Sequence, residues 1–143
     1  MKNKLILILL SLLMIPLFSC EKIEFKNDIS GTWEILFAEG GLFPHSIETN
    51  YSHLRLKKGD HYFIFNHDTL KAKGEFTIYK SGYGHYQNAE PYFIKLRKGS
   101  GQDPKLKFPI DVNLDVRFCS NDTLILYDRG IADGNEYCFI RSK

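Results

Sequence analysis

Five histidines are the side chains best suited to acid–base chemistry or metal binding: His45, His53, His61, His67 and His85. No two of them stand at a metal-ligand spacing with a cysteine in support. His61 and His67 bracket a predicted strand, which holds them about 20 Å apart at about 3.3 Å per residue. The chain has neither a Gly-x-Ser-x-Gly motif nor a glycine-rich phosphate loop. The sequence therefore predicts no catalytic residue, metal site or cofactor, and we do not expect an enzyme.

A tyrosine-rich segment, residues 79–92, is the best candidate for ligand contacts. Tyr83, Tyr86 and Tyr92 lie in it beside two glycines. Aromatic rings with polar tips on a flexible loop suit stacking on a sugar or closing the mouth of a cavity. The alternative is an ordinary turn whose rings cover neighbouring strands.

Two cysteines in the second half of the chain, Cys119 and Cys138, permit a disulfide in an oxidising compartment. Cys119 ends one predicted strand, and Cys138 lies in the middle of the next strand but one. Two strand spacings of about 4.8 Å exceed the disulfide reach of about 7 Å. The spacing disfavours a bridge without excluding it.

The N-terminus carries an export signal. Lys2 and Lys4 precede an apolar run from Leu5 to Phe18, which is shorter than the roughly 20 residues of a membrane-spanning helix. The ending Leu17-Phe18-Ser19-Cys20 resembles the lipobox of bacterial lipoproteins. That resemblance implies a signal peptide over 1–19, a lipid on Cys20 and a tether over 20–28. Glu21 differs from the aspartate of the inner-membrane retention signal, which favours the outer membrane.

Removal of this segment leaves an electrically neutral domain. The whole chain has 143 residues and a net charge of +2, and Lys2 and Lys4 account for that excess. A neutral body of this size forms one domain with a real core. It argues against a nucleic-acid partner, since nucleic-acid binding needs a basic surface.

Period-two alternation of apolar side chains after residue 28 predicts strands. It is clearest over 70–79, with Leu70, Ala72, Gly74, Phe76 and Ile78 on one face. It also runs over 105–119, as one long bent strand or as two strands meeting near Pro109. In all, about eight strands are predicted: 30–38, 51–57, 60–66, 69–80, 85–97, 104–118, 122–128 and 134–141.

The connections between these strands are mostly tight turns, which favour antiparallel neighbours. About eight such strands with one apolar face close most simply into an up-and-down barrel, which also removes exposed edges. A two-sheet sandwich is the alternative, because several strands are apolar on both faces.

The opening Ile29-Ser30-Gly31-Thr32-Trp33 resembles the Ile-x-Gly-x-Trp start of the lipocalin-like lipoproteins of Bacteroidetes. Residues 73–78 and 122–127 add weaker similarity to that group. The resemblance implies a lipocalin-like barrel over residues 29–143 that holds a small apolar molecule.

The predicted inward set decides whether such a molecule has room. An eight-stranded barrel is either filled by side chains or left with space for one small ligand. The set is aromatic, with Ala72 and Gly74 as its small members, so both outcomes stay open. The candidate ligand contacts are Trp33, Phe37, Ala72, Gly74, Phe76, Tyr83, Tyr86 and Tyr92.

The last predicted hairpin is apolar on its outer face as well, through Ile125, Tyr127, Cys138 and Ile140. Such a patch is large for a monomer surface. Either another part of the chain covers it or it binds a protein. In the second case the protein is an interaction, inhibitor or structural lipoprotein with a packed barrel and no ligand.

Lipidation of Cys20 can be checked on protein isolated from its native membrane. We expect mass spectrometry to find a mature chain that begins at Cys20 and carries acyl groups there. A Cys20→Ala variant should keep its signal peptide. An unmodified Cys20, or a mature chain that begins elsewhere, would remove the lipoprotein assignment.

Overall fold

The computed structural model describes residues 29–40, 45–80, 92–128, 130 and 134–143. The predicted signal peptide and tether, Cys20, Tyr83 and Tyr86 lie outside the described residues.

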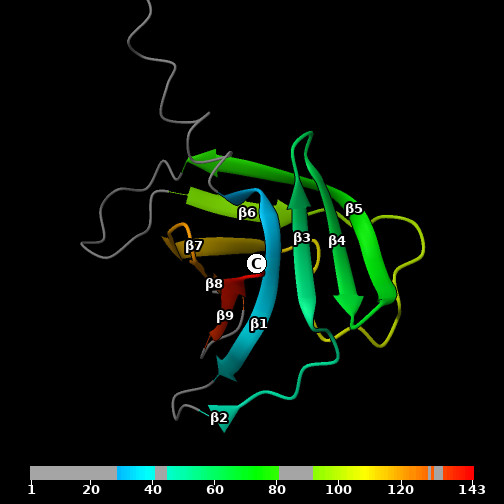
Figure 1. Ribbon diagram of the computed structural model, residues 1–143, viewed down its shortest axis with the longest axis horizontal. Coiled ribbons are helices and arrows are strands. Elements are labelled where there is room, and N and C mark those ends of the chain that lie inside the picture. Colours follow the sequence, from blue (N-terminus) through cyan, green and yellow to red (C-terminus); the bar gives the residue numbers. More distant parts are fainter. Residues whose placement is uncertain (1–28, 41–44, 81–91, 129, 131–133) are drawn as a thin grey trace, which may run out of the picture.

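The described residues form one antiparallel sheet of nine strands (Figure 1). The strands are Gly31–Gly40 (β1), His45–Ser46 (β2), His53–Lys57 (β3), His61–Asn66 (β4), Thr69–Lys80 (β5), Tyr92–Leu96 (β6), Asn113–Cys119 (β7), Thr123–Asp128 (β8) and Asn135–Arg141 (β9). Each strand from β3 to β9 pairs with the next, and β9 pairs with β1. This pairing closes an eight-stranded up-and-down barrel, with β2 added beside the end of β1. The predicted barrel is confirmed, and the sandwich alternative is wrong.

The segment predicted as a strand over 104–118 is a strand only in its second half. Pairing begins only at Asn113, and the chain before it turns through Asp111, whose φ is 64°. Residues 105 and 107 are fastened instead to Asn50: its side-chain amide donates to the carbonyl oxygen of Lys105, and its side-chain oxygen accepts from the N–H of Lys107. The first half of the long alternating run is therefore a connection laid against the barrel.

A β-bulge in β1 reverses the side-chain alternation that the sequence predicts. Ile35 pairs with Phe139 and Phe37 with Cys138, so Leu36 is an extra residue on β1. Because one inserted residue exchanges the two faces, Ala38 is buried while Phe37 is 38% exposed. The prediction that Phe37 faces the interior is wrong.

A second bulge has the same effect on β5. Ile64 pairs with Ala72 and Phe65 with Leu70, which leaves Lys71 as the extra residue. Leu70, predicted to point inward, is exposed.

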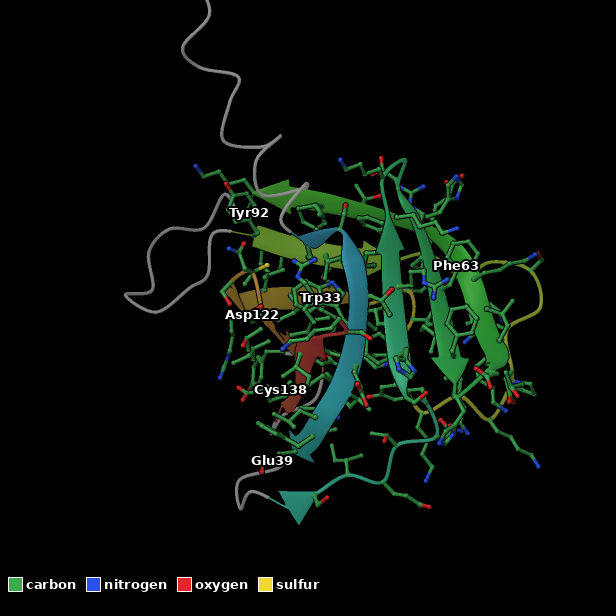
Figure 2. The ribbon with its side chains drawn as sticks, viewed as in Figure 1. Trp33, Glu39, Phe63, Tyr92, Asp122 and Cys138 are labelled. Atoms are coloured by element: carbon green, nitrogen blue, oxygen red, sulfur yellow. The ribbon has the colours of Figure 1, made fainter. Side chains whose placement is uncertain are left out.

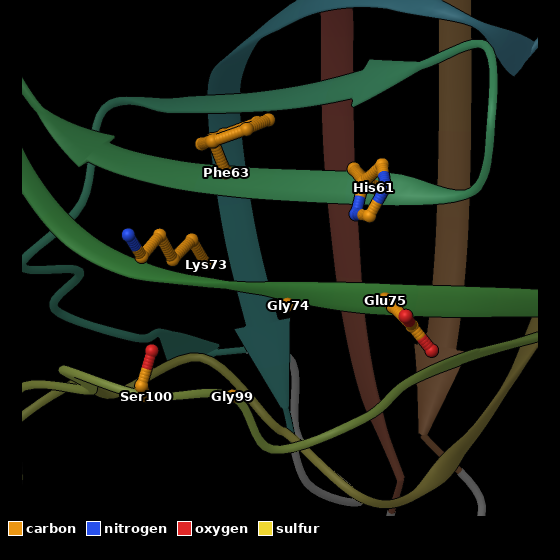
Figure 3. Close-up of a pocket in the computed structure, with 7 residues that line it drawn as sticks. All are labelled: His61, Phe63, Lys73, Gly74, Glu75, Gly99 and Ser100. Carbon is orange, nitrogen blue, oxygen red and sulfur yellow. The ribbon is translucent and has the colours of Figure 1, made fainter.

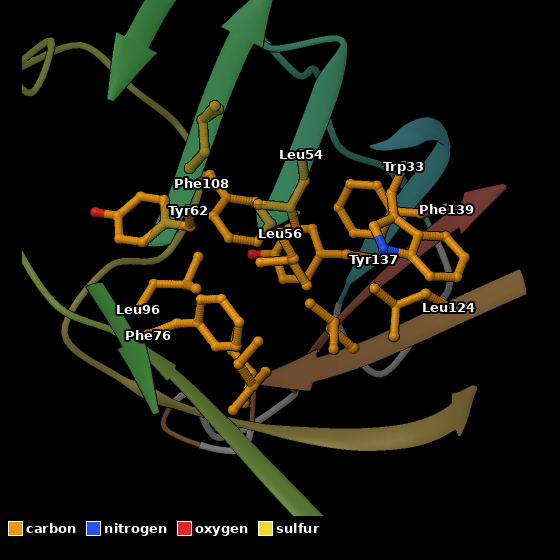
Figure 4. Close-up of a cluster of buried hydrophobic side chains, with 14 of the residues drawn as sticks. Trp33, Leu54, Leu56, Tyr62, Phe76, Leu96, Phe108, Leu124, Tyr137 and Phe139 are labelled. Atoms are coloured by element: carbon orange, nitrogen blue, oxygen red, sulfur yellow. The ribbon is translucent and has the colours of Figure 1, made fainter. Parts of the chain in front are cut away.

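Trp33 anchors one part of the core (Figures 2 and 4). It is fully buried, and its indole N–H donates to the carbonyl oxygen of Ile29 at 2.8 Å. The Arg141 guanidinium lies over the ring at 4.2 Å and donates to the carbonyl oxygen of Ser30 at 2.8 Å. A buried indole N–H needs a hydrogen-bond acceptor, and the carbonyl oxygen of Ile29 provides one.

Phe108 packs in the core from the β6–β7 connection (Figure 4). Its ring centroid lies 5.1 Å from that of Tyr51, 5.3 Å from Tyr137 and 6.1 Å from Phe139. It is 3% exposed. A side chain that no strand provides thus occupies the space between the strands, and we call it the plug.

The plug can be tested against a matched phenylalanine. Phe108→Ala should lower the free energy of unfolding by about 3–5 kcal/mol, because it removes a buried ring and leaves a cavity. Phe37→Ala, which truncates a partly exposed ring, should cost about 1 kcal/mol or less. Urea unfolding of both variants measures the difference, and equal costs would mean that Phe108 does not fill the core.

Candidate functional site

The barrel interior brings together three of the predicted ligand contacts. Trp33, Ala72 and Phe76 are buried among the core side chains. Tyr92 is half-buried at the start of β6 and packs against the same cluster. The inward positions of Trp33, Ala72 and Phe76 are as predicted; whether any of them touches a ligand stays a prediction.

The space that Gly74 leaves in the interior is taken by Tyr62. A Cβ at Gly74 would stand 2.8 Å from Cε1 of Tyr62 and 2.6 Å from the carbonyl oxygen of Arg97. The Tyr62 hydroxyl donates to that same oxygen at 2.9 Å. Burial, and to a lesser extent Asp111, raises the pKa of Tyr62 to about 12. This tyrosine is therefore a neutral filler that closes the gap beside the glycine.

One polar group inside the barrel has no hydrogen-bond partner among the described residues, the hydroxyl of Tyr51. Tyr51 is 3% exposed and lies edge-on to Phe108. Burial raises its pKa far above the usual range, and Tyr137 adds to that effect. A buried hydroxyl without a partner costs about 1–3 kcal/mol, so this atom is a polar group that the described core does not satisfy.

The outer apolar patch extends further than the sequence predicted. Cys138 pairs with Ile125 of β8 on one side and with Phe37 of β1 on the other. Leu36 is 58% exposed, Phe37 38% and Ile140 39%. We call these residues the outer patch: Leu36, Phe37, Ile125, Tyr127, Cys138 and Ile140. Sequence reasoning missed Leu36 and Phe37, because the bulge that turns Phe37 outward has no marker in the sequence.

Charged groups border this patch. The Arg117 guanidinium lies 3.6 Å above the Tyr127 ring and pairs with Glu136 at 3.2 Å. Glu34 and Glu39, on β1, are exposed. The border is therefore mainly acidic, with Arg117 already paired within it.

The thiol of Cys138 lies within the patch and is nearly buried. Burial raises its pKa, and Glu136 acts in the same direction, so the thiol stays protonated. Cys138 and Cys119 are not joined by a disulfide.

The outer face of β3–β5 carries stacked aromatic rings under cations. Phe63 and Phe65 stack at 6.5 Å. The Lys57 ammonium lies 4.9 Å from the centre of the Phe63 ring, and the Arg55 guanidinium 5.2 Å from that of Phe65. Beside Phe63 lies a pocket of about 230 Å³, which we call the β4–β5 pocket (Figure 3). Sequence reasoning missed this site.

A second pocket, of about 470 Å³, lies along β6 and β7 and includes two buried carboxylates. Asp115 is 1% exposed, and Asp128 accepts from the N–H of Gly130 at 2.8 Å. Phe93 lines the pocket and stacks on Tyr79 at 5.4 Å. Burial raises the pKa of Tyr79, and the charge of Asp115 adds to it.

No protein-family model, curated protein or solved structure matches this chain. Within the described residues, no three acidic, histidine or cysteine side chains gather as a metal site would require. The same residues contain no helix with the length and apolar character needed to cross a bilayer. The lipocalin-like assignment therefore stays a prediction from sequence motifs.

Proposed function

We propose that this protein is a lipid-anchored lipoprotein of the bacterial cell envelope that binds another protein through the outer patch. The barrel is then a packed scaffold. The observation that carries the proposal is the exposure of Leu36, Phe37 and Ile140 on one face, while Phe108 fills the interior. An apolar patch with a polar border is typical of a protein–protein interface.

The charges around the patch indicate the partner's chemistry. Glu34 and Glu39 are exposed beside the apolar residues, and no lysine or arginine of the described part of β1 offsets them. Complementary charge steers association and suppresses wrong partners. The proposed partner therefore presents an apolar surface bordered by lysine or arginine.

The proposed lipid on Cys20 anchors the barrel at a membrane surface. The tether of residues 20–28 spans at most about 30 Å when fully extended. This length would keep the barrel close to the membrane and restrict its partners to proteins at the same surface. Glu21 favours the outer membrane, as the sequence indicates.

A small apolar ligand inside the barrel is the second candidate, and the Tyr51 hydroxyl favours it. A guest with one polar group would pair with that hydroxyl and take the place of the Phe108 ring. Because the plug comes from a connection, its withdrawal breaks no ladder between strands. Tyr83, Tyr86 and Tyr92 keep their predicted role at the barrel mouth under this candidate.

Photocrosslinking in the native cell tests the first candidate. A photoreactive residue at position 36 should form an adduct with one discrete protein, and Phe37→Lys should abolish this adduct. The matched control is position 77, an exposed site on β5. Circular dichroism should show an unchanged fold in each variant.

Two outcomes would contradict the interface. The first is that positions 36 and 77 form the same adducts, or that position 36 forms none. The other is saturable uptake of a fluorescent fatty acid by the purified full-length protein, weakened by Tyr51→Phe; that result would favour the second candidate.

A further inference from the structure

The β4–β5 pocket lies on the opposite side of the barrel from the outer patch. In the closed order of strands, β4 and β5 stand half-way round from β8 and β9. Figure 2 labels Phe63 on β4 and Cys138 on β9, on the two sides of the barrel. A ligand at this pocket would leave the outer patch free.

Gly99 shapes the pocket. A Cβ at Gly99 would stand only 1.9 Å from the carbonyl oxygen of Lys73, so the loop backbone packs directly on β5. The backbone of this loop and of β5 thus meet at the hollow, and the side chains that line it come from β4, β5 and the loop (Figure 3).

The border combines one flat apolar wall with several kinds of polar group. Phe63 pairs across the strands with Lys73, and His61 pairs with Glu75. Ser100 adds a hydroxyl from the loop beside Gly99. The pocket therefore has a phenyl ring, an ammonium, a carboxylate, an imidazole and a hydroxyl around a volume of about 230 Å³.

That volume falls below the roughly 300–1,000 Å³ of pockets for drug-sized ligands. It suits one ring of a longer molecule. A sugar ring has an apolar C–H face that packs on a phenyl ring and several hydroxyls that hydrogen-bond to carboxylate, imidazole and serine.

The charged side chains around the pocket indicate which kind of sugar it would bind. Phe63 lies between Arg55 on β3 and Lys73 on β5 in the register of the sheet, and Lys57 lies over its ring. Glu75 is the carboxylate of the pocket. The surplus of cations favours a ligand that carries a carboxylate of its own, because charge-assisted hydrogen bonds are the stronger ones.

We propose that the β4–β5 pocket binds one acidic sugar residue, a uronate, of an extended polysaccharide. The sugar ring packs on Phe63, its carboxylate pairs with Lys73, and its hydroxyls bind Glu75 and His61. Arg55 and Lys57 receive the neighbouring acidic residue of the same chain. The site is independent of the protein partner at the outer patch.

Calorimetric titration of the purified full-length protein with a short oligogalacturonate tests this site. Binding should be saturable, and the neutral galactan of the same length should bind more weakly. Lys73→Gln should weaken oligogalacturonate binding about tenfold, the loss expected for one charge-assisted bond. Lys95→Gln makes the same charge change on β6, outside the pocket, and should leave the affinity unchanged.

A second pair of variants separates stacking from charge. Phe63→Leu should weaken both the acidic and the neutral oligosaccharide, whereas Phe37→Leu, which changes a partly exposed ring on the opposite side of the barrel, should weaken neither. The proposal is overturned by absence of binding, by equal losses in Lys73→Gln and Lys95→Gln, or by inorganic phosphate or an acidic peptide competing as well as the uronate.

Discussion

The ladder between β1 and β9 is the contact on which the rest of the structure depends. It joins the first strand of the domain to the last and leaves the eight strands without a free edge. Closure also fixes the interior volume, which in a barrel of this size just accommodates side chains. Phe108 adds its ring to the core that the strands form, and the connection that carries this ring is held by hydrogen bonds to Asn50 and, through Asp103, by an ion pair to Lys71.

Because side chains fill the interior, the two candidate binding surfaces lie on the outside of the barrel. The bulge at Leu36, in the same β1–β9 ladder, turns Phe37 outward and enlarges the apolar patch. On the far side of the barrel, Gly99 brings a loop against β5 and forms a hollow beside Phe63. One scaffold thus presents two faces of different chemistry, apolar with an acidic border on β1 and β9 and aromatic with cations on β3–β5.

Local alternation was enough to predict most strands, because a period of two follows directly from backbone geometry. It failed where one extra residue exchanges the faces, at Phe37 and Leu70, since a bulge depends on the partner strand. It also failed over residues 105–112, where apolar residues alternate although these residues belong to no strand. The plug and the β4–β5 pocket need contacts between distant residues, Phe108 with Tyr137 and Gly99 with Lys73, which spacing does not encode.

The chain's own Phe108 occupies the barrel interior. Nuclear Overhauser effects on full-length protein with labelled phenylalanine and tyrosine rings measure this most directly. We predict cross-peaks from the Phe108 ring to the rings of Tyr51 and Tyr137. A Phe108 ring that shows cross-peaks only to water, with ligand protons in contact with Phe139 instead, would mean that Phe108 lies outside the barrel interior.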